Sequence, residues 1–177
     1  MAGGYSLSPM SEFSPLTRED LPSVFLLLER CGVFLPHELA VAREVFTSAL
    51  EPSSGYEVFL VRSGGQVSGV VCFGKNPMTD RVYDLYWIAV APEFQRGGIG
   101  LSLIKFVQEE VRKRKGRKIV IETSSLPSYE PARRLYEKAG FCRAGLLEDF
   151  YAPSNHKVFY VWTVGFSGEE ISSFSGK

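Results

Sequence analysis

The sequence contains few of the features that identify secreted, membrane-spanning or metal-binding proteins. Its 177 residues include only three cysteines and two histidines, and the cysteines are too widely spaced for a CxxC pair or a zinc-ligand cluster. No apolar run approaches the roughly 18 residues that a membrane-spanning helix needs. The N-terminus has neither the basic nor the apolar segment of a signal peptide. These absences predict a cytoplasmic protein with reduced thiols, no metal centre and no membrane partner.

The chain also lacks an excess of charge of either sign. Twenty basic and 20 acidic side chains give a formal net charge of zero, and 45% of the residues are hydrophobic. General nucleic-acid binders are usually basic, and disordered chains are less hydrophobic and more strongly charged. The composition therefore predicts a folded protein that does not bind nucleic acid. We expect one domain over residues 12–166, with a flexible arm over 1–11 and a flexible tail over 167–177, both rich in Gly and Ser.

Hydrophobic periodicity predicts a mixed sheet flanked by helices. Apolar residues recur at helical spacing in some segments, whereas β-branched and aromatic residues gather in others. The expected helices span 17–32, 36–51, 99–115 and 132–139, and the expected strands span 56–61, 67–73, 82–90, 118–122, 145–151 and 158–164. The strand–helix–strand unit from 82 to 122 implies a right-handed crossover between two parallel strands. We therefore expect an α/β (α+β) domain with a mixed, mostly antiparallel sheet of about six or seven strands.

The segment 95–100 (QRGGIG) lies between an expected strand and an expected helix. A helix start exposes unpaired N–H groups and the positive end of the helix dipole, and glycines let a bulky anion reach the backbone. These features favour a phosphate or pyrophosphate site, although a similar turn can be a simple connection. A Walker A loop would need Lys and Ser or Thr where Leu101 and Ser102 stand. A dinucleotide fingerprint would need a third glycine where Leu103 stands.

Two sequence blocks resemble the GNAT superfamily of acetyl-CoA-dependent N-acetyltransferases. The first, residues 90–104, contains the Gln-x-x-Gly-x-Gly pattern of that family's acetyl-CoA-binding turn. The second, residues 132–141 (ARRLYEKAGF), is similar to the family's short helix with a catalytic Tyr and a terminal Gly-Phe. The resemblance covers roughly residues 13–165, including the closing hairpin. It implies a GNAT-like fold in which the parallel strands splay apart and leave a slot for acetyl-CoA.

The resemblance also implies which residues hold acetyl-CoA (CoA), the co-substrate. The pyrophosphate would contact the backbone N–H groups of the turn, and the pantetheine arm would pair with the end of the preceding strand like an added strand. Near the second block, Tyr129 stands where many members of the family have Asn, which puts a contact in doubt. The implied cofactor-binding residues are Ile88, Ala89, Val90, Gln95, Arg96, Gly97, Gly98, Ile99, Gly100, Leu101, Tyr129 and Ala132.

Acetyl transfer to an amine requires the movement of protons. An alkylamine with a pKa of about 10 must lose a proton before it attacks, and the leaving thiolate benefits from a proton donor. The resemblance places Tyr136 at the family's proton-donating Tyr, whose hydroxyl can hydrogen-bond the thioester sulfur. Asp84 and Glu122 are alternative catalytic bases, and water held by backbone groups is a third. Because alternate strand residues share a face, we expect Asp84, Tyr86 and Ile88 to point to one side.

The acceptor is less constrained by the sequence. The aromatic residues that could line its entrance are Tyr83, Tyr86, Phe150 and Tyr151. Beside them, Glu148 and Asp149 could attract a cation. The same aromatic side chains could equally belong to the core or to a homodimer interface. We expect the acceptor to be a primary amine of a small molecule, peptide or protein. A catalytically idle acyl-CoA-binding sensor or regulatory module is the alternative.

Overall fold

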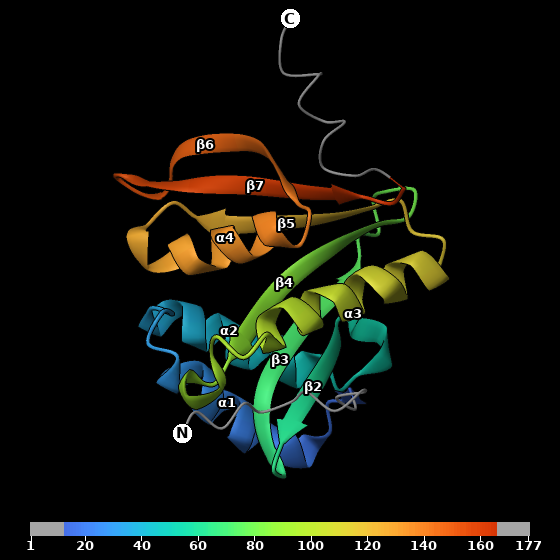
Figure 1. Ribbon diagram of the computed structural model, residues 1–177, viewed down its shortest axis with the longest axis vertical. Helices are drawn as coiled ribbons and strands as arrows, with labels where there is room; N and C mark the ends of the chain where they lie inside the picture. Colours follow the sequence, from blue (N-terminus) through green and yellow to red (C-terminus); the bar gives the residue numbers. More distant parts are fainter. Residues whose placement is uncertain (1–12, 166–177) are drawn as a thin grey trace, which may run out of the picture.

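A seven-stranded sheet forms the centre of the protein (Figure 1). The computed structural model describes residues 13–165, so the expected arm and tail lie outside the described residues. The strands are β1 (Ser14–Pro15), β2 (Glu57–Ser63), β3 (Gln66–Lys75), β4 (Val82–Val90), β5 (Lys118–Ser124), β6 (Cys142–Ala152) and β7 (Asn155–Thr163). Their order in the sheet is β1-β2-β3-β4-β5-β7-β6. Among these described pairs, only β4 and β5 run parallel, which confirms the predicted mixed, mostly antiparallel sheet.

Helices cover both faces of the sheet. One face of β2, β3 and β4 packs against α1 (Leu21–Arg30) and α2 (Pro36–Ser48). The other face packs against α3 (Ile99–Lys113) and α4 (Glu130–Lys138), and Figure 1 shows α3 crossing β3 and β4. Short 3₁₀ helices are η1 (Arg18–Asp20), η2 (Pro52–Ser54), η3 (Pro92–Phe94) and η4 (Pro127–Tyr129). Over residues 13–165, none of the helices is long and apolar enough to cross a membrane.

Each face of the sheet has its own hydrophobic core. Beneath α3 and α4, the buried side chains include Phe73, Leu103, Ile104, Val107, Ile121 and Tyr136. Beneath α1 and α2, they include Val24, Leu28, Phe46, Leu60, Val70 and Cys72. Successive residues of a strand point to opposite faces, so a strand with helices on both faces is apolar on both. This is why β3 reads as a nearly continuous apolar run in the sequence.

The parallel strands β4 and β5 are paired only over their first four positions. Residues 82–85 of β4 pair with residues 118–121 of β5. Beyond these positions β4 continues to Val90 and β5 continues to Ser124 without pairing to each other. The strands diverge toward their carboxyl ends, as Figure 1 shows. This divergence, called the split below, confirms the predicted splayed pair.

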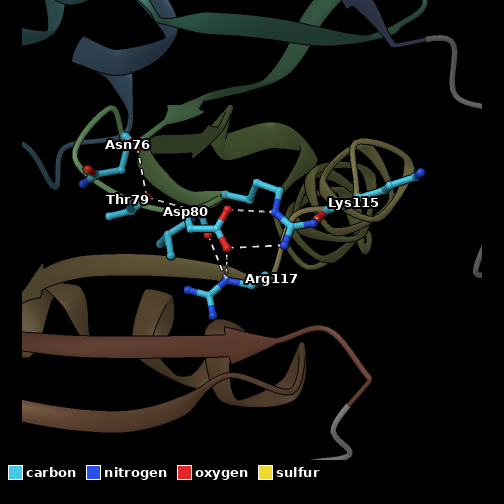
Figure 2. A network of polar contacts seen from close by, with 7 residues as sticks. Asn76, Thr79, Asp80, Lys115 and Arg117 are labelled. Carbon is cyan, nitrogen blue, oxygen red and sulfur yellow. Dashed lines mark hydrogen bonds and ion pairs between the residues drawn. The ribbon is translucent and has the colours of Figure 1, made fainter.

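A network of polar contacts holds the two strands together where they are paired (Figure 2). The Asp80 carboxylate contacts Nε of Arg81 at 3.0 Å and Nε of Arg117 at 3.5 Å. The Arg81 guanidinium also donates to the Lys115 carbonyl at 3.3 Å, and Arg117 Nε donates to the Asp80 carbonyl at 2.8 Å. These residues lie in the segments that lead into β4 and β5. The network therefore fixes the closed end of the split.

A β-bulge in β4 changes which residues share a face. The register between β3 and β4 shifts next to Tyr86, which has no partner on β3, and such an extra residue shifts the alternation by one. The Tyr86 ring packs edge-on against Tyr56 on the side of α1 and α2, and its hydroxyl lies 3.5 Å from an Asp84 oxygen. Ile88 instead packs against the core beneath α3. The expectation that Ile88 shares a face with Asp84 and Tyr86 is therefore wrong.

Candidate active site

The turn between β4 and α3 presents consecutive backbone N–H groups without acceptors. Arg96 and Gly98 have φ angles of 63° and 85°, and α3 begins directly after Gly98. The Ser102 N–H donates to the Gly98 carbonyl at 3.0 Å. Within the described part of the chain, none of the N–H groups of residues 96–101 makes a hydrogen bond of normal length and angle to a protein acceptor. Free N–H groups at the positive end of a 15-residue helix suit a phosphate group.

Side chains from neighbouring elements fix this turn against the end of β4. The Gln95 amide donates to the Val90 carbonyl at 3.1 Å, and the Cys31 thiol contacts the same carbonyl at 3.3 Å. At the end of α1, Arg30 makes two hydrogen bonds of 3.0 Å to the Glu93 carboxylate in η3. A turn held from two sides is preorganised for a ligand, because little order has to be gained on binding.

The end of β4 keeps one backbone edge open beside the split. The Ala91 N–H donates to the Ser68 carbonyl of β3 at 2.9 Å, and Ala89 pairs with β3. Neighbouring strand residues direct their backbone groups to opposite edges, so Ile88 and Val90 direct theirs toward the split. The Val90 carbonyl already accepts from Gln95 and Cys31, which leaves the backbone groups of Ile88 and the Val90 N–H open there. Because β5 has already diverged there, an extended ligand can pair with this edge as an additional strand would.

Tyr136 of α4 combines a buried ring with an unpartnered hydroxyl. The residue is 5% exposed and packs against Phe141 and, edge-on, against Tyr160. Its hydroxyl has no hydrogen-bond partner among residues 13–165. Among the described residues, Ser14 Oγ is the one side-chain polar atom that is fully buried and has no hydrogen-bond partner. The Tyr136 hydroxyl also has no partner, so it is not fully buried. The hydroxyl therefore reaches accessible space. Burial raises the pKa of Tyr136, so the hydroxyl is protonated at neutral pH and can act as a donor.

Tyr129 and Glu38 connect the two sides of the split at its open end. The Tyr129 hydroxyl lies 2.8 Å from each Glu38 carboxylate oxygen and donates to that carboxylate. Glu38 is in the first turn of α2, where it also accepts from the Leu35 N–H at 2.7 Å. α2 packs on the β2–β4 side of the sheet, whereas η4 follows β5. Burial, and then the hydrogen bond to Glu38, raise the pKa of Tyr129.

The two candidate bases have different partners. Asp84 of β4 is half-buried and accepts a hydrogen bond from the Asn76 amide at 2.9 Å. Burial raises the pKa of Asp84; the Asn76 hydrogen bond opposes this shift and the negative charge of Glu122 adds to it. Glu122 is the first residue of β5 beyond the paired positions, and it forms an ion pair with Lys157 at 2.5 Å. Asp84 therefore binds a proton more readily than usual, while a cation compensates the charge of Glu122.

The four aromatic residues expected at the acceptor entrance separate into two groups. Tyr83 is 5% exposed and packs in the core beneath α3, on the opposite face from Asp84, and this placement favours a structural role. Tyr86, Phe150 and Tyr151 are all exposed, between 41% and 50%. These three side chains stay candidates for contact with an acceptor. Over residues 13–165, no three His, Cys, Asp or Glu side chains gather as metal ligands would.

Sequence reasoning missed two residues near the split, Glu38 and Lys157. Glu38 lies three residues after Leu35, a spacing that indicates helix capping and nothing more. Lys157 lies in a strand whose alternation indicates only that it points away from the core beneath α4. Their places in the site depend on α2 lying over β4 and on β7 pairing with β5, and neither follows from the local sequence.

The fold and the site together define a class of protein. A split parallel pair, an open strand edge and free helix N-terminal N–H groups form a site for an extended ligand that carries a phosphate group. Beside it lie a tyrosine hydroxyl and two carboxylates, which are groups that can transfer protons. This is the arrangement expected of an acyltransferase that uses an acyl-CoA.

Comparison with known proteins identifies the family. The profile of the Acetyltransferase (GNAT) family matches residues 21–141, and the chain belongs to this family. A GNAT-family protein from Desulfovibrio desulfuricans, known from a crystal structure, is 36% identical with a TM-score of 0.82, over 87% of this chain and 99% of that one. The ribosomal protein bS18-alanine N-acetyltransferase of Escherichia coli is 28% identical over 145 residues, 80% of this chain and 88% of its own length. The uncharacterised N-acetyltransferase YsnE of Bacillus subtilis is 41% identical over 78 residues, 44% of this chain and 50% of its own length.

Proposed function

We propose that this protein is an N-acetyltransferase that transfers the acetyl group of acetyl-CoA directly to a primary amine. The observation that carries the proposal is the open backbone edge formed by Ile88 and the Val90 N–H, beside the free N–H groups of residues 96–101. The pantetheine arm would pair with that edge, and the pyrophosphate would lie on those N–H groups. Membership of the GNAT family supports acetyl-CoA as the co-substrate.

Tyr136 is the acid in this proposal. The amine attacks the thioester carbonyl, and the Tyr136 hydroxyl donates a proton to the departing CoA thiolate. Its unpartnered hydroxyl and raised pKa support this role. The matched control is Tyr160, whose hydroxyl donates to Glu137 at 2.9 Å on the same side of the sheet. We expect Tyr136→Phe to lower kcat by about 100-fold and Tyr160→Phe to leave it nearly unchanged. Full kcat in Tyr136→Phe at every pH would remove Tyr136 from the reaction.

Asp84 and Glu122 are both proposed as the group that takes the proton from the acceptor. The raised pKa of Asp84 supports the first, and the position of Glu122 at the start of the split supports the second. The pH dependence of kcat/KM for Asp84→Asn and Glu122→Gln decides between them. The variant that lacks the true base loses the acidic limb of the profile. If both variants keep this limb, the proton leaves through water.

The acceptor is a primary amine of a small molecule, peptide or protein in this proposal. The name of the Escherichia coli relative, which describes acetylation of an alanine of a ribosomal protein, supports a protein amine. The exposed rings of Tyr86, Phe150 and Tyr151 support contact with an acceptor larger than a bare alkylamine. The cytoplasmic location and the homodimer stay predictions.

The deciding experiment measures acetyl-CoA binding and CoA release on the same preparation. Calorimetry measures the affinity for acetyl-CoA, and a thiol reagent then follows CoA release with peptides that have a free amino terminus, lysine peptides and small amines. We expect saturable binding and turnover with at least one of these acceptors. Saturable binding without turnover on any amine would instead identify an acyl-CoA-binding module.

A further inference from the structure

Lys157 is a largely buried cation within the candidate site. It lies in β7 opposite Ser124 of β5, and its side chain is only 12% exposed. Its ammonium contacts the Glu122 carboxylate at 2.5 Å. Burying an ammonium is unfavourable unless a carboxylate compensates its charge, and Glu122 supplies that charge here. The lysine is therefore held in a defined position instead of extending into solvent.

The end of β6 completes the surroundings of this amine. Pairing between β6 and β7 stops after Leu147 and resumes at Ala152, and Figure 1 shows β6 arching away from β7. Phe150 and Tyr151 belong to the unpaired stretch. The Lys157 Nζ lies 3.7 Å from the centroid of the Phe150 ring and 5.7 Å from that of the Tyr151 ring. Aromatic faces attract cations, so the two rings and Glu122 form a cage around the ammonium.

This cage borders the split from the face of the sheet opposite the core that holds Tyr136. Glu122 stands at the point where β5 leaves β4, which puts the amine of Lys157 beside the split. Burial, and then the charge of Glu122, raise the pKa of Tyr151 to about 12. The amine and a carboxylate that can accept its proton therefore lie on one side of the split, and the proposed acid belongs to the core on the other side.

We propose that Lys157 is an internal acceptor, so that the protein acetylates the Lys157 ε-amine from its own bound acetyl-CoA. The inference rests on the proposed function, because it needs acetyl-CoA in the split. Glu122 first takes one proton from the ammonium. The Lys157 nitrogen then forms a bond to the acetyl carbonyl carbon, and the bond from that carbon to sulfur breaks. A second proton from the nitrogen ends on the CoA thiolate through Tyr136, and Glu122 releases its proton to water.

Acetylation of Lys157 changes the charge of the acceptor entrance. The acetylated side chain is neutral, so it no longer compensates the Glu122 carboxylate or occupies the faces of the aromatic rings as a cation. The cage then has a free carboxylate and two free ring faces, which together suit the ammonium group of an external acceptor. The unmodified protein has its own cation in this place.

The test follows acetylation of individual lysines in the full chain by peptide mass spectrometry after addition of acetyl-CoA. Lys118 is the matched control, because it is also a half-buried strand lysine but donates to Thr163 Oγ1 at 2.9 Å at the closed end of the split. We expect Lys157 to react at least about tenfold faster than Lys118, since a preoriented amine reacts as an intramolecular group. Its rate constant should not change with protein concentration.

Variants separate enzymatic modification from simple chemical acetylation. We expect Tyr136→Phe and Glu122→Gln each to slow modification of Lys157 by about tenfold or more, with no change at Lys118. Lys157→Arg keeps the cation and removes the signal at this position. A rate at Lys157 no higher than at Lys118, a rate that increases with protein concentration, or a rate unchanged in Tyr136→Phe overturns the inference. Turnover of an external amine with Lys157 unmodified overturns the inference alone, whereas absence of saturable acetyl-CoA binding overturns the proposed function as well.

Discussion

The hydrogen bond between Tyr129 and Glu38 should contribute measurably to the stability of the fold. Tyr129→Phe removes only the hydroxyl, which lies 2.8 Å from each carboxylate oxygen. A hydrogen bond to a charged group contributes about 1.5–3 kcal/mol when buried. Both side chains are only half-buried, and Glu38 keeps the Leu35 N–H as a donor. We therefore expect a loss of about 1 kcal/mol, which lowers the Tm by about 2–4 °C in a chain of this length.

A double-mutant cycle isolates this contact. Urea denaturation of Tyr129→Phe, Glu38→Gln and the double variant gives the coupling energy, which we expect to be about 1 kcal/mol. Tyr56→Phe is the matched control, because the Tyr56 hydroxyl makes no hydrogen bond within residues 13–165. That variant should change stability by less than about 0.5 kcal/mol. CoA should also dissociate faster from Tyr129→Phe, since the contact closes the open end of the split. A coupling energy near zero would refute the conclusion that this contact links the two sides.

Three further predictions concern the strands that form the site. Burial raises the pKa of Asp84 above its ordinary 3.8, so ionised Asp84 destabilises the fold; Asp84→Asn should raise the Tm near neutral pH. The gain in Tm should shrink as the pH falls toward 3.8, because Asp84 then becomes protonated and uncharged. Thermal denaturation of both proteins at a series of pH values measures this, and a gain in Tm that stays constant with pH would contradict the reasoning. Gly74→Ala puts a Cβ 2.2 Å from a backbone carbonyl oxygen in the segment before β2, so it should cost about 1–3 kcal/mol. Gly145→Ala is the control, because the atom nearest to its new Cβ is 3.7 Å away, and it should be tolerated. Urea denaturation compares the two variants, and equal unfolding midpoints for Gly74→Ala and Gly145→Ala would contradict the argument. Asp80→Asn weakens the exposed network at the closed end, so its small loss of Tm at low ionic strength should disappear in high salt; a salt-independent loss would show another cause.

The elements of secondary structure were largely predictable because their signals are local. The strand expected over 82–90 is β4 with the same bounds, and the helix expected over 99–115 is α3 with an end two residues earlier. Glycines and apolar periodicity carry these signals, since they act within a few residues. The two-residue strand β1 was missed, because a strand this short has no periodicity of its own. The bulge at Tyr86 was missed for a related reason: it exists only in the register against β3.

The candidate site was predictable only in part. The glycines of residues 95–100 predict the turn, and a motif in one short helix points to Tyr136. Glu122 and Asp84 could be named from the sequence, but their different partners could not. Lys157 reaches Glu122 only because β7 inserts between β5 and β6 in the sheet. A contact of this kind joins residues 35 positions apart, and no local pattern encodes it.

The sequence by itself determined that this chain has a mixed α/β fold, with a glycine-rich helix start suited to an anion and a tyrosine in a recognisable short helix. These properties follow from composition, periodicity and motif, which act over neighbouring residues. Only the tertiary structure decided that β4 and β5 separate after four paired positions, that Tyr129 meets Glu38 across the opening, and that Lys157 is held against Glu122 beneath two aromatic rings. The reason is physical: strand order, the bulge in β4 and the packing of α2 bring distant residues together, and burial then sets their charges and partners.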